Sequence, residues 1–195
     1  QRQLYCADAD SGVLQWTRPR PTSYSVLASS PVLVGESVFM AAPHGSPGQL
    51  YRLLAPTGAG QPVGVADAWT TPLDTCQGGV VHVDGRLYGS TYSRRGSWQA
   101  IDARNGELLY ETTEFLKGCV LYADGRLYTL AEDGWMLLLE PTENAFAVRG
   151  RFRLAEARDR NAWAHPVISD GRLYLRYLDT ISCYDIRTAH SPRKS

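Results

Sequence analysis

A pentapeptide recurs in this chain, and it constrains the fold more than any other feature of the sequence. The segment Asp84-Gly85-Arg86-Leu87-Tyr88 returns with identical residues at positions 124–128 and 170–174. A divergent fourth copy occupies positions 35–39, so successive copies are separated by 49, 40 and 46 residues. Three identical copies at near-regular spacing indicate a structural repeat, and a repeat unit must pack against its neighbours to bury its apolar surface.

The chemistry of the pentapeptide indicates the kind of unit that repeats. Asp-Gly between apolar segments is a strong signal for a two-residue β-hairpin, because a type I′ turn needs positive φ at both central residues. We therefore expect three such hairpins, at Asp84-Gly85, Asp124-Gly125 and Asp170-Gly171. A period of about 40 to 50 residues with hairpin turns is typical of the four-stranded blades of a β-propeller.

A second motif repeats between the pentapeptides. An Asp begins a turn, where its carboxylate accepts backbone N–H bonds, and a Gly follows where the chain needs a left-handed conformation. An aromatic residue then ends the next strand. The motif comprises Asp8, Gly12 and Trp16 in one copy and Asp102, Gly106 and Tyr110 in another, and Asp185 begins a third copy. We interpret these side chains as structural.

The two motifs together divide the chain into blades. The expected fold is all-β: a β-propeller of four-stranded antiparallel blades, with about four to five blades present as a partial or small ring. Residues 1–187 form one propeller domain, and residues 188–195 are expected to be a mobile tail. The blade parts are residues 3–18, 28–74, 76–113, 117–154 and 163–187. The chain is expected to begin inside a blade.

Composition excludes several functional classes. The 20 Lys and Arg residues balance 20 Asp and Glu residues, which argues against electrostatic binding of nucleic acid. No apolar segment approaches the roughly 20 residues that a membrane-spanning helix needs. Four cysteines, at positions 6, 76, 119 and 183, contain no Cys-x-x-Cys pair, so a zinc site is not expected and their disulfide state is left open.

The repeats resemble those of the PQQ-like β-propellers, a family that includes quinoprotein alcohol dehydrogenases and BamB-like assembly factors. The resemblance rests on Leu-Tyr-x-x-Asp-Ala-x-Ser/Asn-Gly-x-Leu-x-aromatic alternating with Asp-Gly-Arg-Leu-Tyr, and it covers residues 3–187. It implies that an aromatic residue of one blade, such as Trp16 or Tyr110, docks on the neighbouring blade. It also implies the C-terminal half of a larger propeller and an extracytoplasmic, periplasmic location.

Two functions are compatible with this resemblance. The first is a non-catalytic binding or protein-interaction scaffold that needs no cofactor, which the sequence favours. The alternative is a fragment of a PQQ-dependent alcohol dehydrogenase, which would need PQQ, Ca²⁺ and a catalytic base. The adjacent Cys-Cys pair of those enzymes is missing here, and no other catalytic or metal-ligating motif stands out.

A candidate ligand site follows from the repeat register. Ligands of propellers bind at one mouth of the central channel, where the first strands of the blades converge. Residues placed there are Gln77, Lys117 and Trp163, each seven positions before an Asp-Gly pair, and His165, five positions before one. A cation, an indole and an imidazole could hold an anionic or planar ligand. The alternative is that these side chains only cap the channel.

The expected partners are therefore a protein or a small ligand at one face of the propeller. Self-association that completes the ring is a further expectation, because the last blade lacks its fourth strand. Nucleic acid and a membrane span are not expected.

Overall fold

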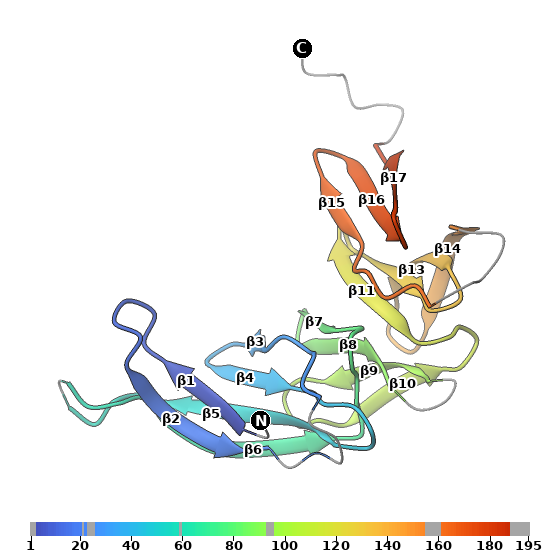
Figure 1. Cartoon of the computed structure of the whole chain (residues 1–195). Helices are drawn as coiled ribbons and strands as arrows, with labels where there is room; N and C mark the ends of the chain where they lie inside the picture. The colour runs from blue at the N-terminus through green and yellow to red at the C-terminus, as the bar shows by residue number, and fades with distance from the viewer. Residues whose placement is uncertain are drawn as a thin grey trace. The chain divides into compact units, whose positions relative to one another are not determined.

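The structure is a computed structural model that describes residues 3–20, 22, 26–58, 60–92, 96–154 and 161–187. The chain forms two compact units, residues 1–117 (unit 1) and residues 118–195 (unit 2), and each is described by itself. Figure 1 shows that both units are built from antiparallel strands; no helix occurs among the described residues. The described residues accordingly contain no helix with the length and apolarity to cross a membrane.

Unit 1 contains three antiparallel sheets (Figure 1). The first is a two-stranded sheet of β1 (Gln3–Ala7) and β2 (Leu14–Pro19). The second has the order β3-β4-β5-β6, comprising β3 (Val32–Val34), β4 (Ser37–Met40), β5 (Gly48–Leu54) and β6 (Gly64–Thr71). The third has the order β10-β9-β8-β7, comprising β7 (Val80–Val83), β8 (Arg86–Ser90), β9 (Trp98–Asp102) and β10 (Leu108–Thr112).

Unit 2 contains two antiparallel sheets. One has the order β11-β12-β13-β14, comprising β11 (Gly118–Ala123), β12 (Arg126–Ala131), β13 (Trp135–Pro141) and β14 (Phe146–Arg153). The other has the order β15-β16-β17, comprising β15 (Val167–Ser169), β16 (Arg172–Tyr177) and β17 (Thr180–Asp185). In every sheet, strands that are consecutive in the sequence are hydrogen-bonded neighbours, as in the meander of a propeller blade.

The repeated pentapeptide forms the turn between the first two strands of a sheet. Asp84, Asp124 and Asp170 have φ of 47°, 48° and 49°, and the glycines that follow them have φ between 70° and 76°. Both central residues of each turn are thus left-handed, which is the backbone of a type I′ turn. Aspartate tolerates this conformation better than most residues, and glycine adopts it without steric cost.

Each unit has its own apolar core. In unit 1, Phe39, Leu50, Leu73, Leu87 and Ile101 are buried together between the second and third sheets. In unit 2, a second core joins the two sheets through Leu130, Met136, Ala162, Leu173 and Leu175. Each core therefore joins two successive sheets of its own unit.

These sheets confirm the predicted fold class, an all-β protein built from four-stranded antiparallel propeller blades. The two-stranded and three-stranded sheets are incomplete blades. The predicted C-terminal tail, residues 188–195, lies outside the described residues.

Candidate functional site

The four residues that the sequence places at the ligand site lie in connections that lead into the first strand of a sheet. Gln77 is between β6 and β7, and Lys117 is between β10 and β11, both in unit 1. Trp163 and His165 are both between β14 and β15, in unit 2. Gln77 is half-buried and His165 is exposed.

Lys117 contacts an aromatic residue of the β8–β9 loop. Its ammonium Nζ donates a hydrogen bond of 3.0 Å to the carbonyl of Tyr92 and lies 4.2 Å from the centroid of the Tyr92 ring. The His44 ring packs nearly perpendicular to the Tyr92 ring, with the ring centroids 4.8 Å apart. The cation predicted for ligand binding thus already makes a cation–π contact within unit 1.

A buried carboxylate joins two loops next to this contact. Asp74, which is 7% exposed, accepts hydrogen bonds from the backbone N–H groups of Gly45 (2.9 Å) and Tyr92 (2.7 Å). Gly45 belongs to the β4–β5 loop and Tyr92 to the β8–β9 loop, so one side chain ties together the loops of two neighbouring sheets. A buried carboxylate needs such donors, and we assign Asp74 a structural role.

Trp163 is exposed, and both its side chain and its backbone carbonyl make hydrogen bonds. Its side chain is 54% exposed, while its indole Nε1 donates a hydrogen bond of 2.9 Å to the carboxylate of Glu132, which is only 7% exposed. Its backbone carbonyl accepts a hydrogen bond of 3.2 Å from the Sγ of buried Cys119. The Glu132 carbonyl also accepts the N–H of Ala162, at 3.0 Å. Burial raises the pKa of the Cys119 thiol to about 12, and the nearby Glu132 adds to this rise, so the thiol keeps its proton.

The repeat register explains both of these contacts. Lys117 and Trp163 occupy the same repeat position, seven residues before an Asp-Gly turn. Their partners Tyr92 and Glu132 also occupy one position, eight residues after the turn of the preceding sheet. Leu178 occupies that second position in the last sheet. The predicted site rested on residues that precede the turns. The register of the residues that follow the turns is the sequence signal that points to Glu132 and Leu178.

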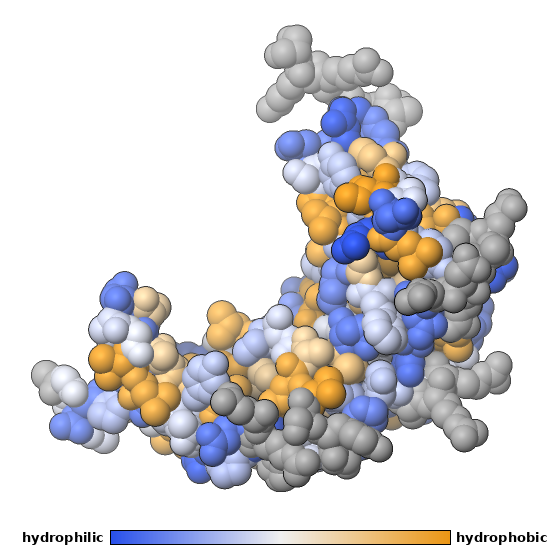
Figure 2. Space-filling model, viewed as in Figure 1, coloured by the Kyte–Doolittle hydropathy of each residue, from blue (hydrophilic) through white to orange (hydrophobic). Residues whose placement is uncertain are grey.

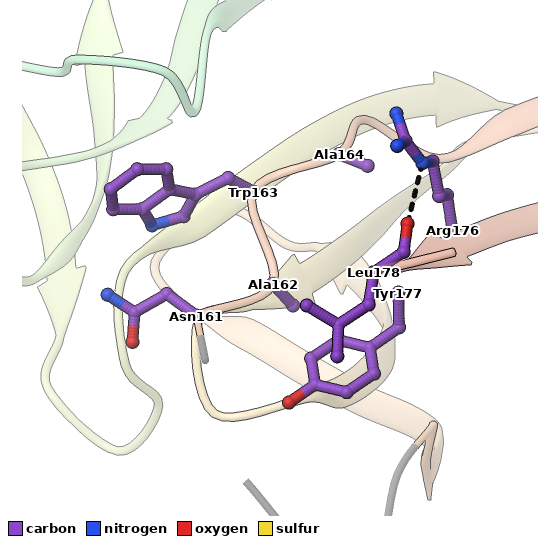
Figure 3. A pocket seen from close by; sticks show the side chains of 7 residues that line it. All are labelled: Asn161, Ala162, Trp163, Ala164, Arg176, Tyr177 and Leu178. Atoms are coloured by element: carbon purple, nitrogen blue, oxygen red, sulfur yellow. Dashed lines mark hydrogen bonds between the residues drawn. The ribbon is translucent and has the colours of Figure 1, made fainter. Parts of the chain in front are cut away.

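A pocket opens beside Trp163 within unit 2, with a volume of about 330 Å³ (Figure 3). In the view of Figure 3, Trp163 and Asn161 lie on one side, Tyr177 and Leu178 lie on the other, and the small side chains of Ala162 and Ala164 stand between them. We call this site the tryptophan pocket. Its lining residues are Asn161, Ala162, Trp163, Ala164, Arg176, Tyr177 and Leu178.

The hairpin wall of the tryptophan pocket is unusual. Leu178, in the two-residue turn between β16 and β17, has φ of 54°, a conformation that is costly for a leucine, and its side chain is 44% exposed. The Arg176 Nε donates a hydrogen bond of 2.9 Å to the Leu178 carbonyl, drawn as the dashed line in Figure 3. The sequence did not predict this turn, because Leu178-Asp179 contains neither the glycine nor the asparagine that usually marks such a turn. Arg176 was therefore not predicted as part of a site.

The described residues do not cluster as a set of metal-ligating side chains. Among the described residues, no group of three or more His, Cys, Asp or Glu side chains comes close enough together to hold a metal ion. The carboxylate-rich donor set that Ca²⁺ prefers beside a quinone is therefore not found in that part of the chain. No disulfide joins any two of the four cysteines, all of which lie in the described part of the chain.

Comparison with known proteins identifies the fold. No protein-family model and no curated protein matches the sequence. Among solved structures, the chain is similar to the crystal structure of BamB from Moraxella catarrhalis, with a TM-score of 0.66 and 15% sequence identity. The match covers 99% of this chain and 54% of the BamB chain, so this chain spans about half of that protein's length. At this identity the similarity shows a BamB-like β-propeller fold.

Proposed function

We propose that this chain is a non-catalytic binding module that holds a partner protein at the tryptophan pocket, without PQQ or Ca²⁺. The similarity to a BamB-like propeller supports a scaffold function in general terms. The geometry of the tryptophan pocket supports this pocket as the place where the partner binds. We also propose an extracytoplasmic location, which rests on the resemblance of the repeats to a mostly extracytoplasmic family.

The observation that carries this proposal is the fixed, exposed indole of Trp163. Burying a carboxylate such as Glu132 is unfavourable unless it is hydrogen-bonded, and here its bond holds a side chain that remains 54% exposed. A tryptophan that is ordered before binding loses less conformational entropy when a partner covers it. Tryptophan and arginine are also the residues most often responsible for binding energy at protein interfaces.

A photo-crosslinking experiment tests the proposal. Benzoylphenylalanine replaces the exposed Asn161 at the rim of the pocket, and the full chain is irradiated in the cells that produce it. We expect a protein adduct that is lost when Trp163→Ala is added. The matched control carries the crosslinker at exposed Arg104, on the β9–β10 turn of unit 1, and should not form that adduct.

Two results would contradict the proposal. The first is an adduct whose yield does not depend on Trp163, since the indole would then contribute nothing to the interface. The second is dye reduction with an alcohol after addition of PQQ and Ca²⁺ to the purified chain, because a binding module has no turnover.

A further inference from the structure

We propose that the tryptophan pocket recognises an internal segment of its partner that presents a single carboxylate next to an aromatic or large apolar side chain. This inference rests on the proposed function and adds the chemistry of the ligand. The charge of the pocket, the shape of its walls and the carboxylates near it each support one part of the inference.

The charge comes from Arg176. Among the described residues that line the pocket, Arg176 alone is charged, and it forms part of the pocket wall. Its Nε is directed at the Leu178 carbonyl, which fixes the plane of the guanidinium group. The two terminal nitrogens of a guanidinium group carry four further N–H donors in a rigid fork, and this geometry matches a carboxylate. A carboxylate is therefore the ligand group that Arg176 complements best.

The walls favour an aromatic or large apolar side chain. Trp163 and Leu178 are exposed by 54% and 44%, and they bound a floor made of two alanines (Figure 3). An indole face that is fixed in place offers a surface for offset stacking. In Figure 2, apolar side chains reach the surface of unit 2 over β15 and β16 beside hydrophilic ones.

Acidic groups near the pocket limit the number of ligand carboxylates to one. The Glu132 carboxylate accepts the hydrogen bond of the indole Nε1, and Asp179 follows Leu178 in the hairpin turn, where it accepts a hydrogen bond from the Thr180 hydroxyl. These carboxylates would repel further negative charges on a ligand. A run of acidic residues is therefore disfavoured relative to one acidic residue beside an apolar one.

The openness of the pocket favours an internal segment. Asn161, Trp163, Arg176 and Leu178 are all exposed, so a peptide chain can enter and leave across the rim. The volume of about 330 Å³ lies near the lower bound of small-molecule pockets, about 300 to 1,000 Å³. The pocket thus accommodates one or two side chains of a longer ligand rather than a complete cofactor.

Four fluorescein-labelled peptides with amidated C-termini test the inference by fluorescence anisotropy with the full chain. The probe is Gly-Gly-Phe-Asp-Gly-Gly. One comparison peptide replaces Asp with Asn, a second replaces Phe with Ala, and a third contains Phe followed by three Asp residues. We expect the probe to bind about tenfold more tightly than each comparison peptide, because each lacks one complementary feature or adds repulsion.

Variants then assign the preference to Arg176. Arg176→Gln should remove the discrimination between the Asp and Asn peptides, and Arg176→Lys should retain only part of it, because lysine lacks the planar fork. The matched control is Arg172→Gln, on the opposite end of the same strand β16, which should bind like the unmodified chain. Circular dichroism of each variant establishes that the sheets are intact.

The outcomes separate this inference from the proposed function. Equal binding of the Asp and Asn peptides that still requires Trp163 would overturn the carboxylate preference and leave the binding module in place. Tighter binding of the tri-Asp peptide would overturn the limit to one carboxylate. Absence of any Trp163-dependent peptide binding, together with absence of the Trp163-dependent crosslink, would overturn both.

Discussion

At the scale of single residues, the site depends on a buried acceptor that orders an exposed indole. The Glu132 carboxylate is costly to bury, and the hydrogen bond from the Trp163 Nε1 offsets that cost. The same repeat position holds Tyr92 in the preceding sheet, where the contact is a cation–π interaction with Lys117. The two contacts thus occupy equivalent positions of the repeat, but one is a hydrogen bond to a carboxylate and the other is a cation–π interaction.

Substitution of Glu132 tests this interpretation. Glu132→Ala removes the acceptor, so we expect a loss of about 1 to 2 kcal/mol in the free energy of unfolding and greater quenching of Trp163 fluorescence by acrylamide. Glu132→Gln retains an amide oxygen that can accept the indole N–H and should behave nearly like the unmodified chain. The signal of Trp163 is obtained by difference against Trp163→Phe. Unchanged quenching in Glu132→Ala would show that the indole is not held by this bond.

Two repeat aspartates, Asp102 and Asp185, also accept hydrogen bonds that hold a nearby side chain in place. Asp102 and Asp185 each bond the side chain and the backbone N–H of the arginine two residues later, Arg104 and Arg187. Hydrogen bonds from the arginine side chain, followed by those from its backbone N–H, lower the pKa of both carboxyl groups below the usual aspartate value. The repeat alignment predicted the aspartates as turn residues but did not identify their arginine partners.

These lowered pKa values predict how stability depends on pH. A carboxyl group whose pKa is lower in the folded state stabilises the fold fully above its unfolded pKa, about 3.9, and this contribution is lost as pH falls through the folded pKa. We therefore expect the free energy of unfolding, measured in urea between pH 5 and pH 2, to fall more steeply for the unmodified chain than for the double variant Asp102→Asn/Asp185→Asn. Parallel curves would contradict this assignment.

At the scale of elements, the turn motif serves inter-sheet packing as well as chain reversal. Gly106, in the β9–β10 turn, has φ of 80°, and a Cβ added there would lie 2.6 Å from the Trp69 Cε3 and 3.0 Å from the Thr70 carbonyl oxygen. Trp69, on β6, therefore packs directly on the backbone of the next sheet's turn. The resemblance implied such docking for Trp16 or Tyr110. Trp69 makes a contact of this kind within unit 1, and the Tyr110 side chain shares hydrogen bonds with Tyr88 and Arg86 of its own sheet.

A pair of glycine substitutions separates packing from backbone strain. Gly125 has a similar φ of 75°, but a Cβ there would meet nothing within 4 Å. Gly125→Ala should cost only the left-handed strain, about 1 to 2 kcal/mol. Gly106→Ala should cost this strain plus about 1 to 3 kcal/mol for displacing the indole of Trp69. Equal costs, measured by urea unfolding, would show that the contact between Trp69 and the turn contributes little.

The blade architecture was predictable because its signals are local, whereas the tryptophan pocket was only partly so. Asp-Gly turns and apolar strands lie within short segments, and their spacing gives the period of the blade. The contact between Trp163 and Glu132 joins residues 31 positions apart, one in the β14–β15 connection and the other in the β12–β13 turn. The exposed Leu178 adopts a turn conformation that its residue type does not indicate. Trp163 was selected by its place in the repeat, but the residues around it depend on how two sheets pack.

At the scale of the whole molecule, the outer strand edges of the two sheets in unit 2 differ in the side chains that protect them. In unit 2 the three-stranded sheet ends at β17, and among the described residues no strand pairs with its outer edge. This edge carries Ile181, whose side chain is 68% exposed. The four-stranded sheet of the same unit ends at β14, which carries arginines at positions 149, 151 and 153. Charged side chains protect an edge strand from pairing with another chain, and an exposed apolar edge favours such pairing.

This contrast predicts concentration-dependent self-association through β17. Sedimentation velocity over a range of protein concentrations should show a mass that rises with concentration, and Ile181→Lys should shift that rise to higher concentration. Val148→Lys, on the edge strand β14 that arginines already protect, is the matched control and should leave the association unchanged. If both lysine variants weakened association equally, a general effect of net charge would explain the result, and pairing at β17 would be rejected. If Ile181→Lys alone acts, the last blade is completed by a strand from a second molecule, because an added charge at that edge disfavours only a partner that approaches it.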